Sequence, residues 1–137
     1  MILADTSAWV EYDRATGSPA DQRIAECSAN DGPLMFTEPV LMEVLAGARS
    51  DAQEADLRRM LLRFGLARFD AVTDFEAATT IYRRCRKAGV TPRGMVDCMI
   101  AAVAHRHSLA LLAWDADMFH VAEVIGIQLD EASLGPA

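Results

Sequence analysis

The sequence predicts a single α/β domain in which a short parallel β-sheet of about five strands is flanked by helices on both faces. The chain has 137 residues, of which 52% are hydrophobic, and this suits one domain with one core. Short apolar segments alternate along the chain with segments of helical pattern. Several apolar segments lack the polar alternation of a strand with one wet face, as expected for strands covered on both sides. We expect the domain to span residues 1–130, followed by a C-terminal tail over residues 131–137.

Local signals place each element in order. Apolar runs predict strands at Met1–Ala4, Leu34–Phe36, Leu66–Phe69, Leu109–Ala113 and Ile125–Leu129. Capping residues, first-turn prolines and terminal glycines predict the helices between them. The first helix begins after Thr6 or Ser7. The next five extend from Ser18 to about Ser28, from Thr37 to about Gly47, over about Ala52–Phe64, from Thr73 or Asp74 to Gly89, and from about Met95 to His107. The last begins after Asp115.

The net charge of −7 is unevenly distributed along the chain. An acidic chain lacks the basic surface typical of nucleic-acid-binding proteins and is unsuited to docking on an anionic membrane. Residues 49–93, however, have ten basic and six acidic side chains, a net charge of +4. Arginine supplies 12 of the 13 cations, and arginine binds phosphate through two parallel hydrogen bonds. The cations that could contact a phosphate-bearing ligand therefore lie in the middle of the chain.

No segment of the sequence has the pattern of a secretion signal or a membrane span. The first residues reach an acid at Asp5 without the basic and apolar regions of a signal peptide. No apolar run approaches the roughly 20 residues that a spanning helix needs. The three cysteines, Cys27, Cys85 and Cys98, fit no zinc or disulfide spacing and are expected to be buried thiols. We therefore expect a cytoplasmic protein with no membrane partner.

Acidic residues follow the predicted strands at the edge where parallel sheets form their binding sites. Asp5 follows the first strand, and Asp115 and Asp117 follow the fourth. Asp97 lies in the first turn of the helix that precedes the fourth strand. Glu43 lies on the helix after the second strand, away from the apolar stripe of that helix. These acids are the candidate site of the chain.

Carboxylates gathered at one edge repel one another unless a cation compensates their charge. Oxygen ligands without a nearby histidine or cysteine cluster suit Mg²⁺ or Mn²⁺. Such a site suits phosphodiester hydrolysis, in which one metal activates a water and a second, if present, stabilises the leaving oxygen. Gly47, four residues after Glu43, leaves room for a ligand beside that side chain.

Structural roles are the alternative for each of these acids. Asp5 could simply cap the first helix, and Asp97 could simply complement a helix dipole. Asp97, however, lies within an apolar run, where an unpaired carboxylate would be costly. The remaining acids, including Asp70 and Asp74, are predicted to cap helices or to lie on solvated surface.

Four motifs occur in order along nearly the whole chain: DTSAW at Asp5, EPVLMEVLAG around Glu43, RGMVDCMIAAVA around Asp97, and LLAWDADMF around Asp115. Together they resemble the PIN domain. More narrowly, they resemble the VapC-type ribonuclease toxins of bacterial toxin–antitoxin pairs.

The resemblance implies a PIN fold and an endoribonuclease that depends on Mg²⁺ or Mn²⁺. It implies that Asp5 and Asp97 are the primary metal ligands. Glu43 and Asp115 would complete the catalytic site directly or through waters, with Asp117 as an adjacent acid that could join them at the metal. The products would have 5′-phosphate and 3′-hydroxyl ends.

Three further side chains are the predicted substrate-binding residues. The resemblance implies that Thr6 or Ser7 holds a ligand water or the first carboxylate. We expect Arg93, in the loop before Asp97, to contact a substrate phosphate. The basic cluster within residues 83–87 would extend the RNA track, or would simply complement the C-terminus of its helix.

The resemblance also implies protein partners. VapC-type toxins form homodimers and bind a small cognate antitoxin in a heterooligomer, with the tail of the antitoxin over the acidic site. An arginine of that tail among the carboxylates would mimic the charge of the metal.

Two other functions compete with the nuclease interpretation. The acids at Asp115 and Asp117 match the Asp-x-Asp motif of haloacid-dehalogenase phosphatases, but that motif follows the first strand of its fold and only 20 residues follow it here. A non-enzymatic receiver module with an acidic pocket would need a lysine at the end of a late strand. The only lysine, Lys87, lies in a predicted helix.

Overall fold

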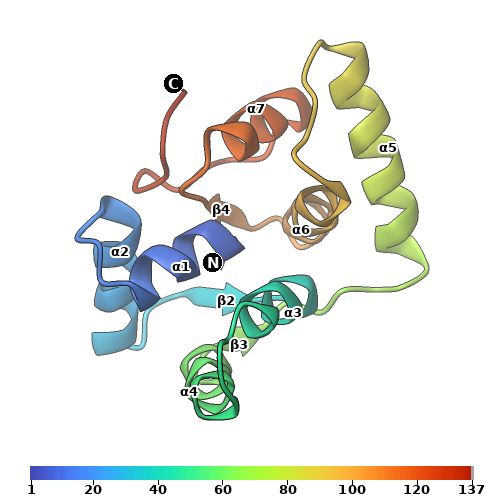
Figure 1. Ribbon diagram of the computed structural model, residues 1–137. Helices are drawn as coiled ribbons and strands as arrows, with labels where there is room; N and C mark the ends of the chain where they lie inside the picture. Colours follow the sequence, from blue (N-terminus) through green and yellow to red (C-terminus); the bar gives the residue numbers. More distant parts are fainter. Residues whose placement is uncertain (137) are drawn as a thin grey trace.

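The computed structural model describes residues 1–136 and confirms the α/β class (Figure 1). Residue 137, the end of the predicted tail, lies outside the described residues. The strands in this part of the chain are β1 (Ile2–Ala4), β2 (Leu34–Phe36), β3 (Gly65–Leu66) and β4 (Ala110–Leu112). The helices are α1 (Thr6–Asp13), α2 (Pro19–Ala29), α3 (Glu38–Ala46), α4 (Asp51–Leu62), α5 (Thr73–Lys87), α6 (Met95–Arg106) and α7 (Ala116–Ile125).

The four strands form one parallel sheet in the order β3-β2-β1-β4. Figure 1 shows α1 and α2 on one side of the strands and α5 and α6 on the other. All three residues of β1 are buried, as expected for a central strand with helices over both faces. The core also includes Trp9 of α1, Ile100 of α6 and Met118 of α7, each fully buried. None of the helices in the described part of the chain has the length and hydrophobicity of a membrane span.

The order of the strands creates a switch point between β1 and β4. From β1 the chain crosses to β2 on one side, and it later returns to place β4 on the other side. Ligand sites of parallel sheets form at such a point, beyond the carboxyl ends of the two strands. Asp5 directly follows β1 and Asp115 begins α7 just after β4, so the fold brings both acids to this edge.

The predicted fifth strand at Ile125–Leu129 is wrong. Helix α7 extends through Ile125 and ends at Gly126, whose φ of +82° is a left-handed conformation that glycine adopts without strain. Beyond it, only Leu129 pairs with β4, through an isolated parallel bridge to Leu111. The local apolar pattern did not distinguish a short strand from the end of a helix.

The third strand is shorter and placed earlier than predicted. It covers Gly65–Leu66 rather than Leu66–Phe69. The backbone N–H of Ala67 still donates to the Phe36 carbonyl, but the N–H of Phe69 donates to the Glu38 carboxylate instead. A side-chain acceptor on α3 thus replaces the next hydrogen bond of the sheet.

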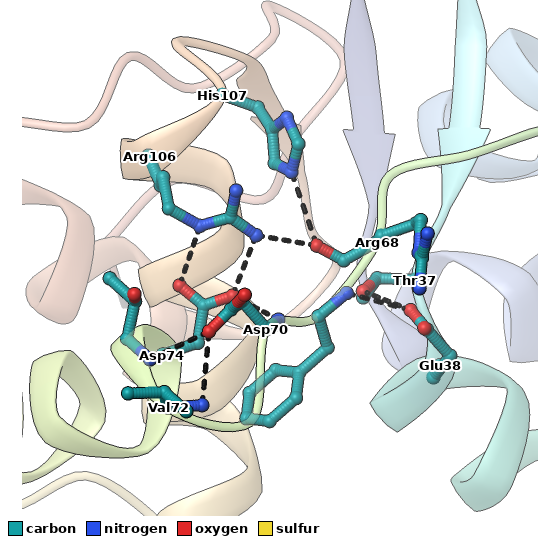
Figure 2. A network of polar contacts seen from close by, with 10 residues as sticks. Thr37, Glu38, Arg68, Asp70, Val72, Asp74, Arg106 and His107 are labelled. Atoms are coloured by element: carbon teal, nitrogen blue, oxygen red, sulfur yellow. Dashed lines mark hydrogen bonds and ion pairs between the residues drawn. The ribbon is translucent and has the colours of Figure 1, made fainter.

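A polar network links the start of α5 to the end of α6 (Figure 2). Arg106 donates from Nε and a terminal nitrogen to the two carboxylate oxygens of Asp74, at 2.9 and 2.8 Å. The same guanidinium and His107 contact the Arg68 carbonyl. Asp70 accepts the backbone N–H groups that open α5, as predicted for a cap. Asp74 is fully buried, so the prediction of a cap or a solvated residue is wrong there.

The chain after α7 returns to the open edge of β4. The N–H of Asp130 donates to the Leu111 carbonyl at 2.8 Å, and the N–H of Leu134 donates to the Ala113 carbonyl at 2.9 Å. The Ser133 hydroxyl accepts from the Ala113 N–H and donates to the Leu111 carbonyl. These contacts cover the edge strand that precedes Asp115.

Candidate active site

The predicted carboxylates of β1, α3, α6 and α7 line one cavity of about 340 Å³ at the switch point. Four of the five predicted acids are among its wall residues, together with all three predicted substrate-binding residues. The wall consists of Asp5, Thr6, Ser7, Val10, Glu11, Glu43, Arg93, Asp97, Trp114 and Asp115. The fifth acid, Asp117, lies outside this set.

Asp5 lies at the bottom of the cavity with an exposed fraction of 2%. Its Oδ2 accepts from the backbone N–H and the hydroxyl of Ser7, so Asp5 rather than Thr6 or Ser7 is the N-cap of α1. Its Oδ1 is buried and makes no hydrogen bond within the described residues. Burial raises the pKa of Asp5 to about 6, an effect that the hydrogen bonds from Ser7 partly oppose and the charges of Glu43 and Asp115 increase. One carboxylate oxygen of Asp5 thus lacks a partner.

Ser7 connects the carboxyl ends of β1 and β4. Its hydroxyl donates to Asp5 Oδ2 at 2.6 Å and accepts the backbone N–H of Trp114 at 2.9 Å. Trp114 directly precedes Asp115 in the chain. One hydroxyl therefore fixes the position of the Asp5 carboxylate relative to the loop that presents Asp115.

Thr6 positions a different carboxylate. Its hydroxyl donates to Glu43 Oε1 at 2.6 Å, across 37 positions of sequence. Glu43 lies midway along α3, and this bond turns it towards the end of β1. Ser7 therefore holds the first carboxylate, Asp5, which is one of the two roles expected for Thr6 or Ser7. Thr6 instead holds the second acid, Glu43.

Asp97 enters the cavity from the first turn of α6, whose N-cap is Gly94. Burial, together with the charges of Asp5, Asp115 and Glu43, raises its pKa to about 7. The Arg93 guanidinium partly opposes this shift. The acids of the cavity therefore act on one another as a repelling cluster, as the sequence predicted.

Arg93 lies against the two acids of α7. Its terminal nitrogen is 3.5 Å from Asp115 Oδ1 and its Nε is 3.5 Å from Asp117 Oδ2. The Asp115 side chain is 11% exposed, whereas that of Asp117 is 45% exposed. Asp115 also caps α7 by accepting the N–H of Asp117. Asp115 is thus the inner acid and Asp117 the outer one.

The donor set of the cavity fits a divalent cation. The acids offer oxygen ligands without nitrogen or sulfur competitors, which suits Mg²⁺ or Mn²⁺. Asp5 Oδ1 is buried without a partner, and a cation would supply one. Within residues 1–136, no group of three histidine, cysteine or acidic side chains is already spaced to hold a metal.

Three wall residues were not predicted from the sequence: Val10, Glu11 and Trp114. Glu11 lies one helical turn after Ser7 on α1, and that spacing of four residues is the signal that places both on one face. Trp114 takes part through its backbone N–H, which no side-chain pattern indicates. Glu11 adds a further acid to the wall of the cavity.

The parallel sheet and the acidic cavity at its switch point together indicate the family to which the chain belongs. The chain belongs to the PIN-domain family, whose sequence profile matches residues 2–124. It is 41% identical over 129 residues to VapC ribonuclease Mb1587 from Mycobacterium bovis, covering 93% of this chain and 96% of that protein. The same figures hold for ribonuclease VapC11 from Mycobacterium tuberculosis.

Solved structures of the same fold are toxin–antitoxin complexes. The chain matches VapBC2 from Rickettsia felis, bound to a DNA fragment from its promoter, with a TM-score of 0.75, 16% identity and coverage of 98% of this chain and 99% of that one. It matches DNA-bound VapBC from Salmonella typhimurium with a TM-score of 0.72, 20% identity and coverage of 94% and 96%. Neither the phosphatase nor the receiver alternative gains support from these comparisons.

Proposed function

We propose that the protein is the endoribonuclease toxin of a VapC-type toxin–antitoxin pair and hydrolyses RNA with Mg²⁺ or Mn²⁺ at the cavity around Asp5 and Asp97. The observation that supports this most is the gathering of acids from β1, α3, α6 and α7 in one cavity. The 41% identity to proteins named ribonucleases over nearly the whole chain supports the reaction class.

Asp5 and Asp97 are proposed as the primary ligands of the cation. Ser7 holds Asp5 Oδ2, which leaves Oδ1 to the cation. Asp97 has a raised pKa of about 7 without metal, so cation binding near neutral pH removes a proton from its carboxyl group. Glu43, oriented by Thr6, and Asp115 complete the site directly or through waters.

A divalent cation bound there supplies an activated water for in-line attack on phosphorus and stabilises the leaving oxygen. The residues of the chain position the reacting groups around it. Asp115 and Glu43, which line the cavity together with Asp5, would accept hydrogen bonds from the attacking water. Asp117, in the first turn of α7 and 45% exposed, is the outer acid of this group.

Cations at the edge of the cavity are proposed to bind the RNA backbone. Arg93 is 71% exposed in its side chain, so it can exchange its ion pairs with Asp115 and Asp117 for a substrate phosphate. The cluster Arg83–Lys87 at the C-terminal end of α5 would extend this track over further phosphates.

The protein is also proposed to bind a cognate antitoxin and to form a homodimer. The matched structures described above are complexes of toxins with antitoxins. An antitoxin arginine inserted among the carboxylates would take the place of the cation and satisfy Asp5 Oδ1. Co-expression with a candidate VapB-type antitoxin, followed by measurement of the mass of the complex, tests this partner directly.

The experiment for the reaction is incubation of the full chain with cellular RNA and with matched RNA and DNA oligonucleotides. Each is tested with Mg²⁺, with Mn²⁺ and with EDTA. We expect discrete RNA fragments with either metal and intact RNA with EDTA. Cleavage that persists in EDTA, or stable phosphorylation of Asp5 or Asp115 by a phosphoryl donor, would contradict the proposal.

A further inference from the structure

A second cavity of about 330 Å³ adjoins the acidic one. The two cavities share the wall residues Val10 and Glu43, so they adjoin at one turn of α1 and the middle of α3. The second cavity extends away from the acids towards the end of α3 and the start of α4. We call it the α3–α4 groove.

The groove has an apolar part and a cationic rim. Its apolar wall residues are Trp9, which is fully covered, and Val44 and Leu57, which keep only 7% and 6% of their surface exposed. Arg14 and Arg49 are exposed at the rim, and within residues 1–136 neither forms an ion pair. Unpaired arginines beside a cavity can bind a phosphate, and their guanidinium planes can stack on a nucleobase.

The acids of the groove do not cancel this rim. The Glu43 carboxylate is bonded by Thr6 and belongs to the catalytic side. Asp13 is the other acid of the wall, facing two arginines. Glu43 aside, the groove wall has two arginines against one acid, a formal charge of +1.

Gln53 provides a polar group that could distinguish bases. Its Oε1 accepts the Arg49 N–H at 2.6 Å, which fixes the orientation of the amide. Its Nε2 makes no hydrogen bond within the described residues and remains available as a donor. A fixed amide donor at the wall of an apolar slot can read a carbonyl or ring nitrogen of a base.

Gly47 keeps the groove open. It is the C-cap of α3, with an ordinary helical φ of −80°. A Cβ at this position would contact only the Val44 and Glu43 carbonyl oxygens, at 3.5 and 3.8 Å. A side chain is therefore compatible with the backbone here, but a large one would extend into the groove.

We propose that the α3–α4 groove is a nucleotide subsite, in which one base of the substrate RNA next to the cleaved bond is bound and selected. Arg14 and Arg49 contact its phosphate, and Gln53 contacts the base edge. This inference rests on the proposed ribonuclease function and adds a source of sequence preference to it. RNA must continue on both sides of the cleaved phosphate, and the groove is the continuation of the acidic cavity past Glu43.

Cleavage of a randomised RNA library, followed by sequencing of the fragment ends, tests the base contact. The wild-type protein should show a base preference at a position adjacent to the cut. Gln53→Ala should reduce that preference by about tenfold at this one position and leave the other positions unchanged. A preference that survives in Gln53→Ala at every position would overturn this assignment.

Salt dependence and steric blocking test the phosphate contacts and the groove itself. The double variant Arg14→Ala/Arg49→Ala should raise the KM for RNA and lower the slope of log affinity against log salt by about 0.7, since the two arginines together neutralise one phosphate of the single strand. Gly47→Leu should reduce RNA cleavage at least tenfold more than hydrolysis of bis(p-nitrophenyl) phosphate, a small diester that needs only the acidic cavity, while Gly47→Ala should have a smaller effect. Arg58→Ala is the matched control, because Arg58 lies on α4 outside the groove and pairs with Glu54.

The outcomes separate this inference from the function on which it rests. If the wild-type protein cuts no RNA with either metal, both fail. If the wild-type protein cuts RNA, Asp97→Asn does not, and the groove variants match Arg58→Ala, only the nucleotide subsite fails. Groove variants that cut RNA normally but bind the antitoxin more weakly would assign the groove to the protein partner instead and overturn the proposal.

Discussion

The Ser7 hydroxyl lies 2.6 Å from Asp5 Oδ2 and accepts the Trp114 N–H at 2.9 Å, which joins the carboxyl ends of β1 and β4 through one side chain. Ser7 and Trp114 are 107 positions apart in the sequence. The geometry of the acidic cavity depends on this link, because Asp5 follows one strand and Asp115 the other.

Replacement of Ser7 by alanine should impair activity more than stability. The variant Ser7→Ala frees both Asp5 Oδ2 and the Trp114 loop, and loss of such a supporting bond typically reduces metal affinity or activity about 10–100-fold. Stability should fall by about 1 kcal/mol. Ser18→Ala removes the N-cap of α2 at a similar cost in stability and should retain activity. Steady-state cleavage rates and urea unfolding measure the two effects, and equal activity losses in both variants would contradict the link.

Neutralisation of the buried acids should stabilise the metal-free fold at neutral pH. The pKa values of Asp5 and Asp97 are raised to about 6 and about 7, so the folded state binds more protons than the unfolded state. Their destabilising effect is absent below about pH 4 and develops as the pH rises through these values. Asp97→Asn should therefore raise the unfolding free energy at pH 8 by on the order of 2 kcal/mol and have little effect at pH 4. Urea unfolding in EDTA at both values measures this, and an equal change at the two pH values would contradict it.

Divalent metal should reverse this destabilisation in the wild-type protein. Mg²⁺ or Mn²⁺ binds the ionised acids of the folded state, so it should raise the Tm in proportion to the logarithm of its concentration. Protons compete with the metal at Asp5 and Asp97, so the rise should be larger at pH 8 than at pH 5.5. Thermal unfolding with increasing metal at the two values measures it. An identical rise in Asp97→Asn would place the metal elsewhere.

Removal of Arg93 should have opposite effects on metal and RNA. Its guanidinium lies 3.5 Å from Asp115 and Asp117 and opposes the raised pKa of Asp97, so it acts as a cation within the acidic cluster. Arg93→Ala should tighten metal binding several-fold, because a competing charge is lost. It should weaken RNA binding and lower the salt slope by about 0.7, because a phosphate contact is lost. Calorimetric metal titration and RNA binding at several salt concentrations test both effects, and Arg59→Ala, on an exposed pair with Asp56, is the control.

The network of Figure 2 should be a major support of the fold. Burial favours the neutral form of Asp74, but the hydrogen bonds from Arg106 and from the Asp70 N–H outweigh it and hold the pKa of Asp74 below its ordinary value. Arg106→Ala leaves this fully buried carboxylate unpaired and should cost about 3–5 kcal/mol. Asp74 stabilises the fold above the pKa of an unfolded aspartate, so the loss should shrink as the pH falls below about 4. Urea unfolding measures this cost, and a cost below about 1 kcal/mol at pH 7 would show that the pair is not a support.

The sequence predicted the parts of this protein that depend on local pattern. The apolar run at Ile2–Ala4 and the acid directly after it placed Asp5 at the edge of a parallel sheet, and the apolar surroundings of Asp97 marked it as more than a helix-dipole residue. The contacts that hold other acids in place connect distant positions: Thr6 binds Glu43, and Arg106 binds Asp74. No periodicity records such pairings. The same limit explains why Asp74, in the first turn of α5, appeared from its sequence position to be an ordinary surface or capping acid.

The most direct test of the central claim is cleavage of an end-labelled RNA by the wild-type protein and by Asp97→Asn, in Mn²⁺ and in EDTA, with the chemistry of the new ends determined. We expect the wild-type protein to produce 5′-phosphate and 3′-hydroxyl ends only with metal, and Asp97→Asn to be at least about a hundredfold slower. Full activity in Asp97→Asn, or 2′,3′-cyclic phosphate ends formed in EDTA, would contradict hydrolysis by metal at the acidic cavity.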